Sequence, residues 1–168
     1  MPSRPRSTTA ARRPDDSVAA ALDRFRRIVR ALRLAARQVE RESALSPAQL
    51  FVLGQIAAEP GQSITELAGR TLTDRSSAAG MVDRLAARGL VRRVRGTEDR
   101  RRVQLELTPD GEAVMARAPS SPTERLLAAL QQLDPATVAR LADDLGTLAR
   151  VMGAAEGPVT MLFEDDES

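Results

Sequence analysis

The chain has 168 residues, a formal net charge of +2, and no cysteine, histidine or tryptophan. Without Cys and His it can form no disulfide, thiol nucleophile, Ser-His-Asp relay or ordinary zinc site. Its acidic residues accompany neither a Gly-rich phosphate loop nor a nucleophile motif. We therefore expect no metal, no cofactor and no enzyme, and the length suits one compact domain with extensions.

Residues 1–16 are rich in Pro, Ser, Thr and Arg, which predicts a disordered basic tail. They lack the apolar centre of a signal peptide, and no stretch approaches the roughly 20 apolar residues of a membrane span. We expect a protein of the cytoplasm with no membrane partner.

Apolar residues recur at spacings of three and four from Val18 to Val39, which predicts a long amphipathic helix over residues 17–42. A narrow seam of this kind packs against other helices. Two uses remain open, a helix folded onto its own subunit and a dimer seam.

The remaining predicted elements follow in chain order, and five of the helices start at a capping side chain: Ser46, Ser63, Thr108, Ser121 and Asp134. Ser46 with Gln49, Ser63 with Glu66, and Ser121 with Glu124 have the spacing of a capping box. Pro follows the cap at the first helical position in four helices, where its missing N–H has no cost. Gly89 is expected to end the helix that contains Arg84. The fold class is mainly α with a small β-hairpin: helices 47–58, 64–71 and 74–88, strands 90–95 and 102–107, and helices 109–117, 122–133 and 135–153.

Positive charge is concentrated in one segment. Residues 84–102 hold eight arginines against two acids, Glu98 and Asp99, in a chain whose total is only +2. This distribution fits a polyanionic partner. A short helix, a turn of about three residues and a second helix form a helix-turn-helix, and the hairpin that follows makes it a winged helix.

The alternation Val103, Leu105, Leu107 predicts a strand that pins the hairpin to the core and leaves residues 95–101 projecting into solvent. Arginines crowded at such a tip suit the duplex phosphates or the narrow minor groove. Asp99 would accept a charge-assisted hydrogen bond from one arginine and aim another outward. The alternative is a solvated charged turn.

Four segments together resemble the MarR family of bacterial winged-helix transcription factors, over residues 45–117. They are DRSS (74–77), MVDRLAARGLVRR (81–93), the pair Asp99 and Arg101, and LTPDG (107–111). The resemblance implies an obligate homodimer whose first and last helices interlock and hold two winged helices over successive major grooves. It also implies a pocket between the dimerisation and DNA-binding parts, where a small organic ligand weakens DNA binding.

Carried over by position, Arg75, Ser76 and Ser77 match the start of the recognition helix. Arg101 matches the arginine that enters the minor groove, so Arg101→Ala should weaken specific binding by about 1–3 kcal/mol. The sequence departs from the family at Ala79 and Gly80, where a hydroxyl residue and a basic one are frequent. Either the helix approaches DNA unusually closely there, or base readout is thinner than usual.

A second departure is the stretch 118–122, which breaks what is often one continuous helix. We expect residues 118–153 to form C-terminal dimerisation helices. The acidic tail 154–168 is expected to be loosely ordered, with docking of residues 161–163 on the body as the alternative. Since Phe25 and Phe51 are the only aromatic residues in the body, an effector pocket would be mostly aliphatic.

The expected function is a dimeric, sequence-specific DNA-binding transcriptional regulator, a repressor released by a small organic ligand. The alternative is a winged-helix protein-interaction module without specific DNA binding. The candidate DNA-binding residues are Thr73, Arg75, Ser76, Ser77, Arg84, Arg95, Asp99, Arg100, Arg101 and Arg102. The candidate dimerisation residues are Val18, Leu22, Phe25, Val29, Leu32, Leu141, Leu145 and Leu148.

Overall fold

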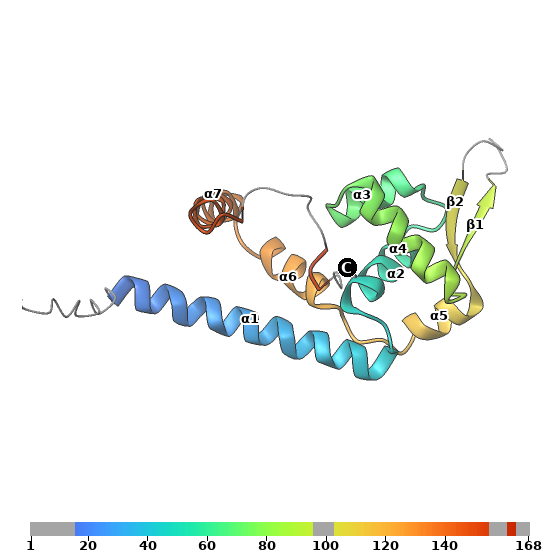
Figure 1. Ribbon diagram of the computed structural model, residues 1–168, viewed down its shortest axis with the longest axis horizontal. Coiled ribbons are helices and arrows are strands. Elements are labelled where there is room, and N and C mark those ends of the chain that lie inside the picture. Colours follow the sequence, from blue (N-terminus) through green and yellow to red (C-terminus); the bar gives the residue numbers. More distant parts are fainter. Residues whose placement is uncertain (1–15, 96–102, 155–160, 164–168) are drawn as a thin grey trace, which may run out of the picture. The chain divides into compact units, whose positions relative to one another are not determined.

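The computed structural model describes residues 16–95, 103–154 and 161–163 (Figure 1). The described elements agree with the predicted ones to within two residues at each end, so the fold class is confirmed. The chain divides into two compact units, residues 1–31 and 32–168. The elements are α1 (Asp16–Ser43), α2 (Pro47–Ala58), α3 (Ile64–Thr71), α4 (Arg75–Ala87), β1 (Val91–Arg95), β2 (Val103–Leu107), α5 (Pro109–Met115), α6 (Pro122–Gln131) and α7 (Pro135–Val151).

Helix α2 is the centre of the second unit. It is apolar on nearly every face, and Phe51, Val52 and Ile56 are at most 1% exposed. A helix of this kind belongs in a core rather than at a surface. It packs against α3, α4, α5, α6 and β2, which places the helix-turn-helix and the hairpin on one common support.

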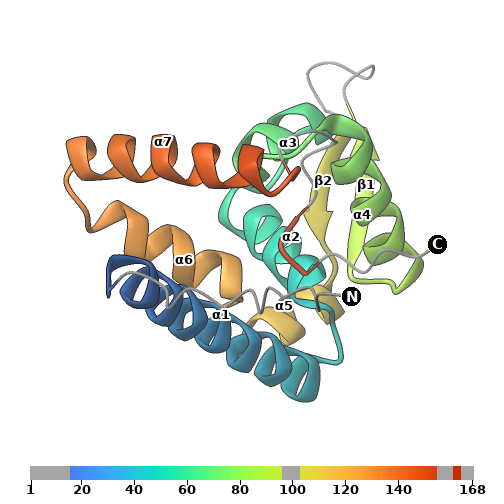
Figure 2. The same cartoon turned by 60° about the vertical axis from the view of Figure 1, so that its left-hand side comes forward.

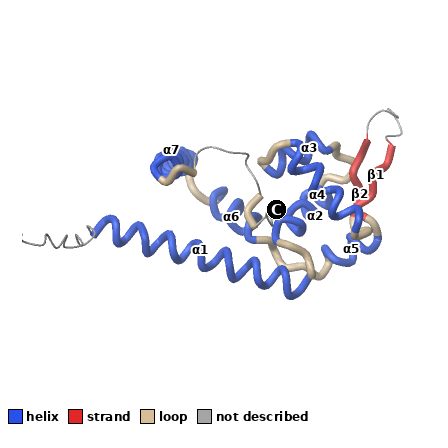
Figure 3. Tube along the Cα trace, in the orientation of Figure 1, coloured by secondary structure: helices blue, strands red, loops and turns tan. Residues whose placement is uncertain are grey.

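The two strands pair antiparallel, with Val91 opposite Leu107 and Arg95 opposite Val103 (Figure 3). The other edge of β2 bonds to the α2–α3 loop, because Gly61 N donates to Leu105 O and Leu105 N to Gln62 O, both at 2.9 Å. Leu105 is fully buried and anchors the hairpin as predicted. Val103 does not, because it lies next to the tip beyond the reach of the core and is 43% exposed.

Gln62 ties this loop to α2, a contact that its sequence position does not reveal. Its side-chain amide donates to the carbonyl oxygens of Gln55 at 2.7 Å and Glu59 at 3.1 Å, which lie at the C-terminal end of α2. Carbonyls at a helix end have no intrahelical partner, so these bonds satisfy them. Gln62 thus fixes the loop against which β2 pairs.

The predicted caps are confirmed. Ser46 with Gln49, Ser63 with Glu66, and Ser121 with Glu124 each form a reciprocal capping box, and Thr108 and Asp134 cap α5 and α7. Gly89 has φ of 72°, the left-handed conformation that ends a helix. The predicted break between α5 and α6 is present, with Ser121 completely buried at the start of α6.

The C-terminal tail departs from the expectation of loose order at Met161. This residue is 6% exposed and belongs to the hydrophobic core cluster of the second unit, whereas Leu162 is 41% exposed. Both views place the segment 161–163 beside α2 (Figures 1 and 2). A buried thioether fills irregular gaps in a core, which accounts for this docking.

Of the two uses left open for helix α1, packing on its own subunit is present at its C-terminal end, whereas the dimer seam stays a prediction. Val39 is fully buried in the core cluster, so the C-terminal end of the helix packs on its own subunit. Val18, Leu22 and Phe25 remain 45–54% exposed. Among the described residues, no helix is both long enough and apolar enough to cross a membrane.

Candidate nucleic-acid interface

Three residues, 72–74, join α3 to α4, as predicted for a helix-turn-helix. Leu72 ends α3 with φ of 56° and ψ of 37°, and its amide donates to Ala68 O. A left-handed leucine costs about 1–2 kcal/mol, which the capping hydrogen bonds offset. The Leu72 side chain is 68% exposed, so the turn presents an apolar group to solvent beside α4.

Asp74 caps α4 and holds the two serines that follow. Ser77 N donates to Asp74 Oδ1 at 2.9 Å, Ser76 Oγ to the same oxygen at 2.5 Å, and Ser77 Oγ to Oδ2 at 2.9 Å. The hydrogen bond from the Ser76 side chain, followed by those from Ser77, holds the pKa of Asp74 well below its usual range. The carboxylate is therefore ionised at neutral pH.

The other predicted residues of the turn and of α4 differ in accessibility. Arg75 and Ser76 are exposed, Ser77 and Thr73 are half-buried, and Arg84 is half-buried with a partner of its own. Thr73 Oγ1 shares a hydrogen bond with Thr71 Oγ1 at 2.9 Å. The structure therefore brings Arg75 and Ser76 together at the surface and leaves Thr73 in a mainly structural position.

The arginines around α4 and β1 fall into two groups. Arg92 pairs with Glu106 at 2.8 Å, Arg93 pairs with Asp83 at 2.6 Å, and Arg88 donates to Ala44 O at 2.8 Å. Arg75 and Arg95 form no ion pair with another described residue. Among the described arginines of α4 and β1, only Arg75 and Arg95 therefore lack a bond to the surrounding scaffold.

The predicted tip of the wing, with Asp99, Arg100, Arg101 and Arg102, lies outside the described residues. The hydrogen bond expected from Asp99 to an arginine is therefore untested. Arg95, the last residue of β1, is exposed at the base of this tip. Of the predicted DNA-binding residues of the wing, Arg95 is therefore the one that the structure describes.

Gly80 lies in the middle of α4, and a Cβ added there would meet nothing within 4 Å. Gly80→Ala should therefore raise the free energy of unfolding by up to about 1 kcal/mol, because alanine has the higher helix propensity. Gly146→Ala in α7, which is equally unobstructed, should stabilise similarly. Urea unfolding of both variants checks this. If α4 approaches DNA closely at Gly80, Gly80→Ala should also weaken duplex binding, whereas Gly146→Ala should not. If neither variant changes duplex binding, the result supports the alternative, in which α4 makes fewer base contacts than is usual.

Two sets of apolar side chains lack cover in the described chain. Helix α7 has no buried residue, and its apolar side chains face solvent in the single chain. Leu145 and Leu148 are 48% and 46% exposed, and Val151 and Met152 at its C-terminal end are 81% and 70% exposed. On α1, Ile28 and Leu34 are also more than half exposed and extend the predicted set. Val29, Leu32 and Leu141 are half-buried.

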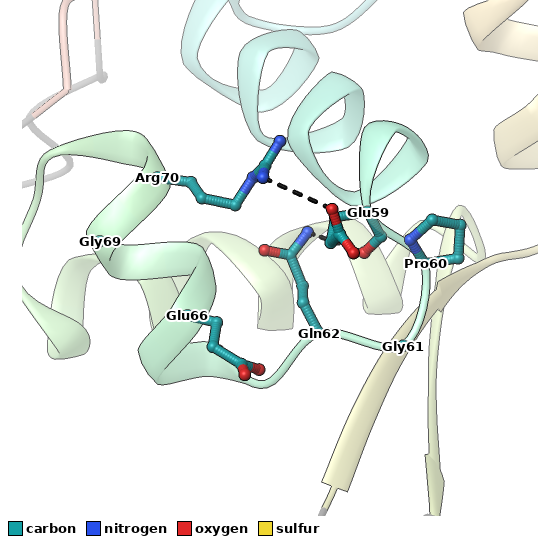
Figure 4. Close-up of a pocket in the computed structure, with 7 residues that line it drawn as sticks. All are labelled: Glu59, Pro60, Gly61, Gln62, Glu66, Gly69 and Arg70. Carbon is teal, nitrogen blue, oxygen red and sulfur yellow. Dashed lines mark hydrogen bonds and ion pairs between the residues drawn. The ribbon is translucent and has the colours of Figure 1, made fainter.

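The described surface of the second unit includes three hollows beside the helix-turn-helix, the hairpin and the α5–α6 turn. One of about 460 Å³ is bounded by the α2–α3 loop and α3, where Arg70 lies 3.7 Å from Glu59 (Figure 4). A second of about 530 Å³ lies between α2, the hairpin and α5, and a third of about 440 Å³ lies at the α5–α6 turn. Over the described ranges, no cluster of acidic residues could hold a metal ion.

A helix-turn-helix followed by an antiparallel hairpin, all supported on one buried helix, defines a winged-helix protein. Residues 45–103 match the model of the MarR family. The PcaV transcriptional regulator of Streptomyces coelicolor, solved with its natural ligand, is 32% identical, with a TM-score of 0.51 and coverage of 86% of this chain and 99% of PcaV. The chain belongs to the MarR family.

Two further relatives bear on function. The transcriptional repressor MdtR of Bacillus subtilis is 34% identical over 94 residues, which cover 49% of this chain and 61% of MdtR. The match thus spans about three fifths of that relative's length. Streptococcus pneumoniae FabT, solved in complex with DNA, shares the fold at 16% identity, with a TM-score of 0.54 and coverage of 84% of this chain and all of FabT.

Proposed function

We propose that this protein is a homodimeric, sequence-specific DNA-binding transcriptional regulator, and that it is a repressor released by a small organic ligand. The observation that carries the proposal is the division of the arginines on the winged helix. Those on the scaffold are bound to acids or carbonyls, whereas Arg75 and Arg95, beside the helix-turn-helix and the wing, form no ion pair with any residue that the structure describes. Uncommitted cations at these two places suit duplex phosphates.

The relatives support a role in transcription. MdtR is named a repressor, and FabT, which shares the fold, was solved on DNA. In the proposed complex α4 enters the major groove with Arg75, Ser76 and Ser77, and the wing with Arg101 enters the adjacent minor groove. Residues 45–117 form the DNA-binding part.

The exposed apolar residues support the homodimer. Two long amphipathic helices that leave their leucines at the surface need a partner, because large uncovered apolar patches are unusual on monomers. We assign Val18, Leu22 and Phe25 of α1, and Leu145 and Leu148 of α7, to the interface with a second copy. A dimer places two winged helices on one duplex, which doubles the phosphate contacts.

The proposed effector is a small, mainly apolar molecule, by analogy with PcaV and its natural ligand. The hollow of about 440 Å³ at the α5–α6 turn lies where the DNA-binding part meets the C-terminal helices. Its described walls combine the apolar Met115, Ala118, Pro119 and Ala128 with the polar Ser120, Glu124 and Arg125, and they include no aromatic side chain. The lack of aromatic groups in these walls agrees with the sequence-based expectation, and the charged residues offer partners for a polar group of the ligand.

We propose a binding protein rather than an enzyme, acting in the cytoplasm on chromosomal DNA. The residues that the structure brings together around α4 are hydroxyls, arginines and one capping carboxylate. This set binds phosphates and base edges but supplies neither a nucleophile paired with a base nor a metal site.

The test is a shift assay on a duplex selected from a randomised library, repeated at several salt concentrations. Arg75→Ala and Arg95→Ala should each reduce the slope of log affinity against log salt by about 2, since a dimer loses two phosphate contacts. The matched control is the double variant Arg92→Ala with Glu106→Ala, which deletes an internal ion pair and should leave the slope unchanged.

Equal losses in the control and in Arg95→Ala would contradict the division of the arginines into two groups. Absence of any duplex retention at low salt would favour the protein-interaction module, in which the arginines dock on an acidic protein surface.

A further inference from the structure

The first turn of α4 contains two hydroxyl groups whose protons are already used. Ser76 Oγ donates to Asp74 Oδ1, and Ser77 Oγ donates to Asp74 Oδ2. A serine hydroxyl has one proton and two lone pairs. Because each hydroxyl donates its one proton to a carboxylate oxygen of Asp74, both hydroxyls can offer only lone pairs to a third group.

The direction of these hydrogen bonds follows from the charge of Asp74. An ionised carboxylate has no proton and can only accept. The hydrogen bonds from Ser76 and Ser77 lower the pKa of Asp74, and the start of the helix favours a negative charge. The hydrogen bonds from the two serine hydroxyls to the ionised carboxylate are therefore stable at neutral pH.

Of the two serines, Ser76 is the one that DNA could reach. It is exposed, whereas Ser77 is half-buried. Ala79 and Gly80 follow Ser76 by three and four residues on the same side of the helix, so no long side chain stands next to it on that side. In the following turn, Asp83 is paired with Arg93.

An acceptor-only hydroxyl restricts the groups it can contact on DNA. Phosphate oxygens are acceptors and cannot bond to the Ser76 hydroxyl while its proton is donated to Asp74. In the major groove, guanine and thymine present acceptors, whereas adenine N6 and cytosine N4 are amino donors. We propose that Ser76, oriented by Asp74, is a specificity residue that accepts a hydrogen bond from the amino group of an adenine or cytosine. This inference rests on the proposed function, in which α4 enters the major groove.

The experiment measures the affinity of the full chain for every single base-pair change in a duplex selected from a randomised library. The wild type should prefer adenine or cytosine over guanine or thymine on one strand, at one position of each half-site, by about tenfold. Ser76→Ala should abolish that preference while leaving the preferences at other positions unchanged. Thr147→Ala, which removes an exposed hydroxyl group from α7, is the control and should alter none.

A base lacking the amino group tests the contact directly. Purine in place of adenine, or 2-pyrimidinone in place of cytosine, should weaken wild-type binding by the same factor as Ser76→Ala and should cause no further loss in that variant. Asp74→Asn keeps a good helix cap but offers an amide N–H that frees one serine proton. This variant should relax the preference towards guanine or thymine.

The proposal is overturned if Ser76→Ala weakens all duplexes equally, which indicates a phosphate contact. It is also overturned if Ser76→Ala changes no base preference, or if the preference it removes is for guanine or thymine. Failure of the wild type to bind any duplex would overturn the proposed function itself, whereas sequence-selective binding with any of these results overturns the inference alone.

Discussion

Gly111→Ala is expected to lower the free energy of unfolding by about 2–3 kcal/mol, a cost typical of overpacking against atoms that cannot move. A Cβ at this position would collide with the backbone carbonyl oxygen of Leu90 and would lie 3.1 Å from its carbonyl carbon. That carbonyl is held in place because it accepts a hydrogen bond from Thr108 N at 3.0 Å. The glycine of LTPDG is therefore required where the first turn of α5 crosses the start of the hairpin.

Urea unfolding monitored by circular dichroism measures the effect. Gly69→Ala is the matched control, because Gly69 is also in a helix but a Cβ there would meet nothing within 4 Å. The control should be neutral or stabilising. A Gly111→Ala protein as stable as the wild type would show that α5 does not cross the hairpin this closely.

Replacing Leu22 and Phe25 together by glutamate is expected to convert the dimer to a monomer and to weaken duplex binding at least about 100-fold. The two side chains are 45% and 50% exposed in the single chain. Burying each of these side chains against a second copy stabilises the dimer by about 1.5–3 kcal/mol. The double substitution removes this stabilisation from both copies at once. Glutamate preserves the helix itself. A monomer also offers one winged helix in place of two, so it retains half of the phosphate contacts.

Sedimentation equilibrium gives the mass, and the shift assay gives the affinity. Arg24→Gln with Arg30→Gln removes the same amount of charge from α1 away from the seam and should remain dimeric. If the Leu22 and Phe25 double variant still forms a dimer, the interface lies elsewhere.

Local rules predicted most of the fold. Five helix starts carried a capping side chain, four of them followed by proline, and each of these caps forms the hydrogen bonds expected of it. Likewise, Gly89 ends α4 in the left-handed conformation. These features depend only on residues three or four positions apart, so the sequence displays them directly.

Features that depend on distant contacts were missed. Met161 lies in the acidic tail, and its docking was only the alternative prediction, because its burial depends on a gap in the core that no local pattern reveals. Val103 has the alternation of a buried strand residue but lies beyond the end of the support. The bonds of Gln62 to the end of α2 arise from the path of a loop rather than from a motif.

The candidate site was predicted in outline but not in its hydrogen bonding. The sequence indicated Arg75, Ser76 and Ser77 through a resemblance, and their shared location at the start of α4 agrees with it. It could not separate arginines bound to the scaffold from uncommitted ones. The Arg93–Asp83 pair joins β1 to α4, and that pairing depends on how the strand packs against the helix.

The mass of the complex with a selected duplex tests the central claim most directly. Sedimentation of the protein with an excess of that duplex should give two chains per DNA molecule, with protection of two half-sites about one helical turn apart. One chain per duplex, or protection of a single half-site, would contradict a dimer that places two winged helices on one DNA.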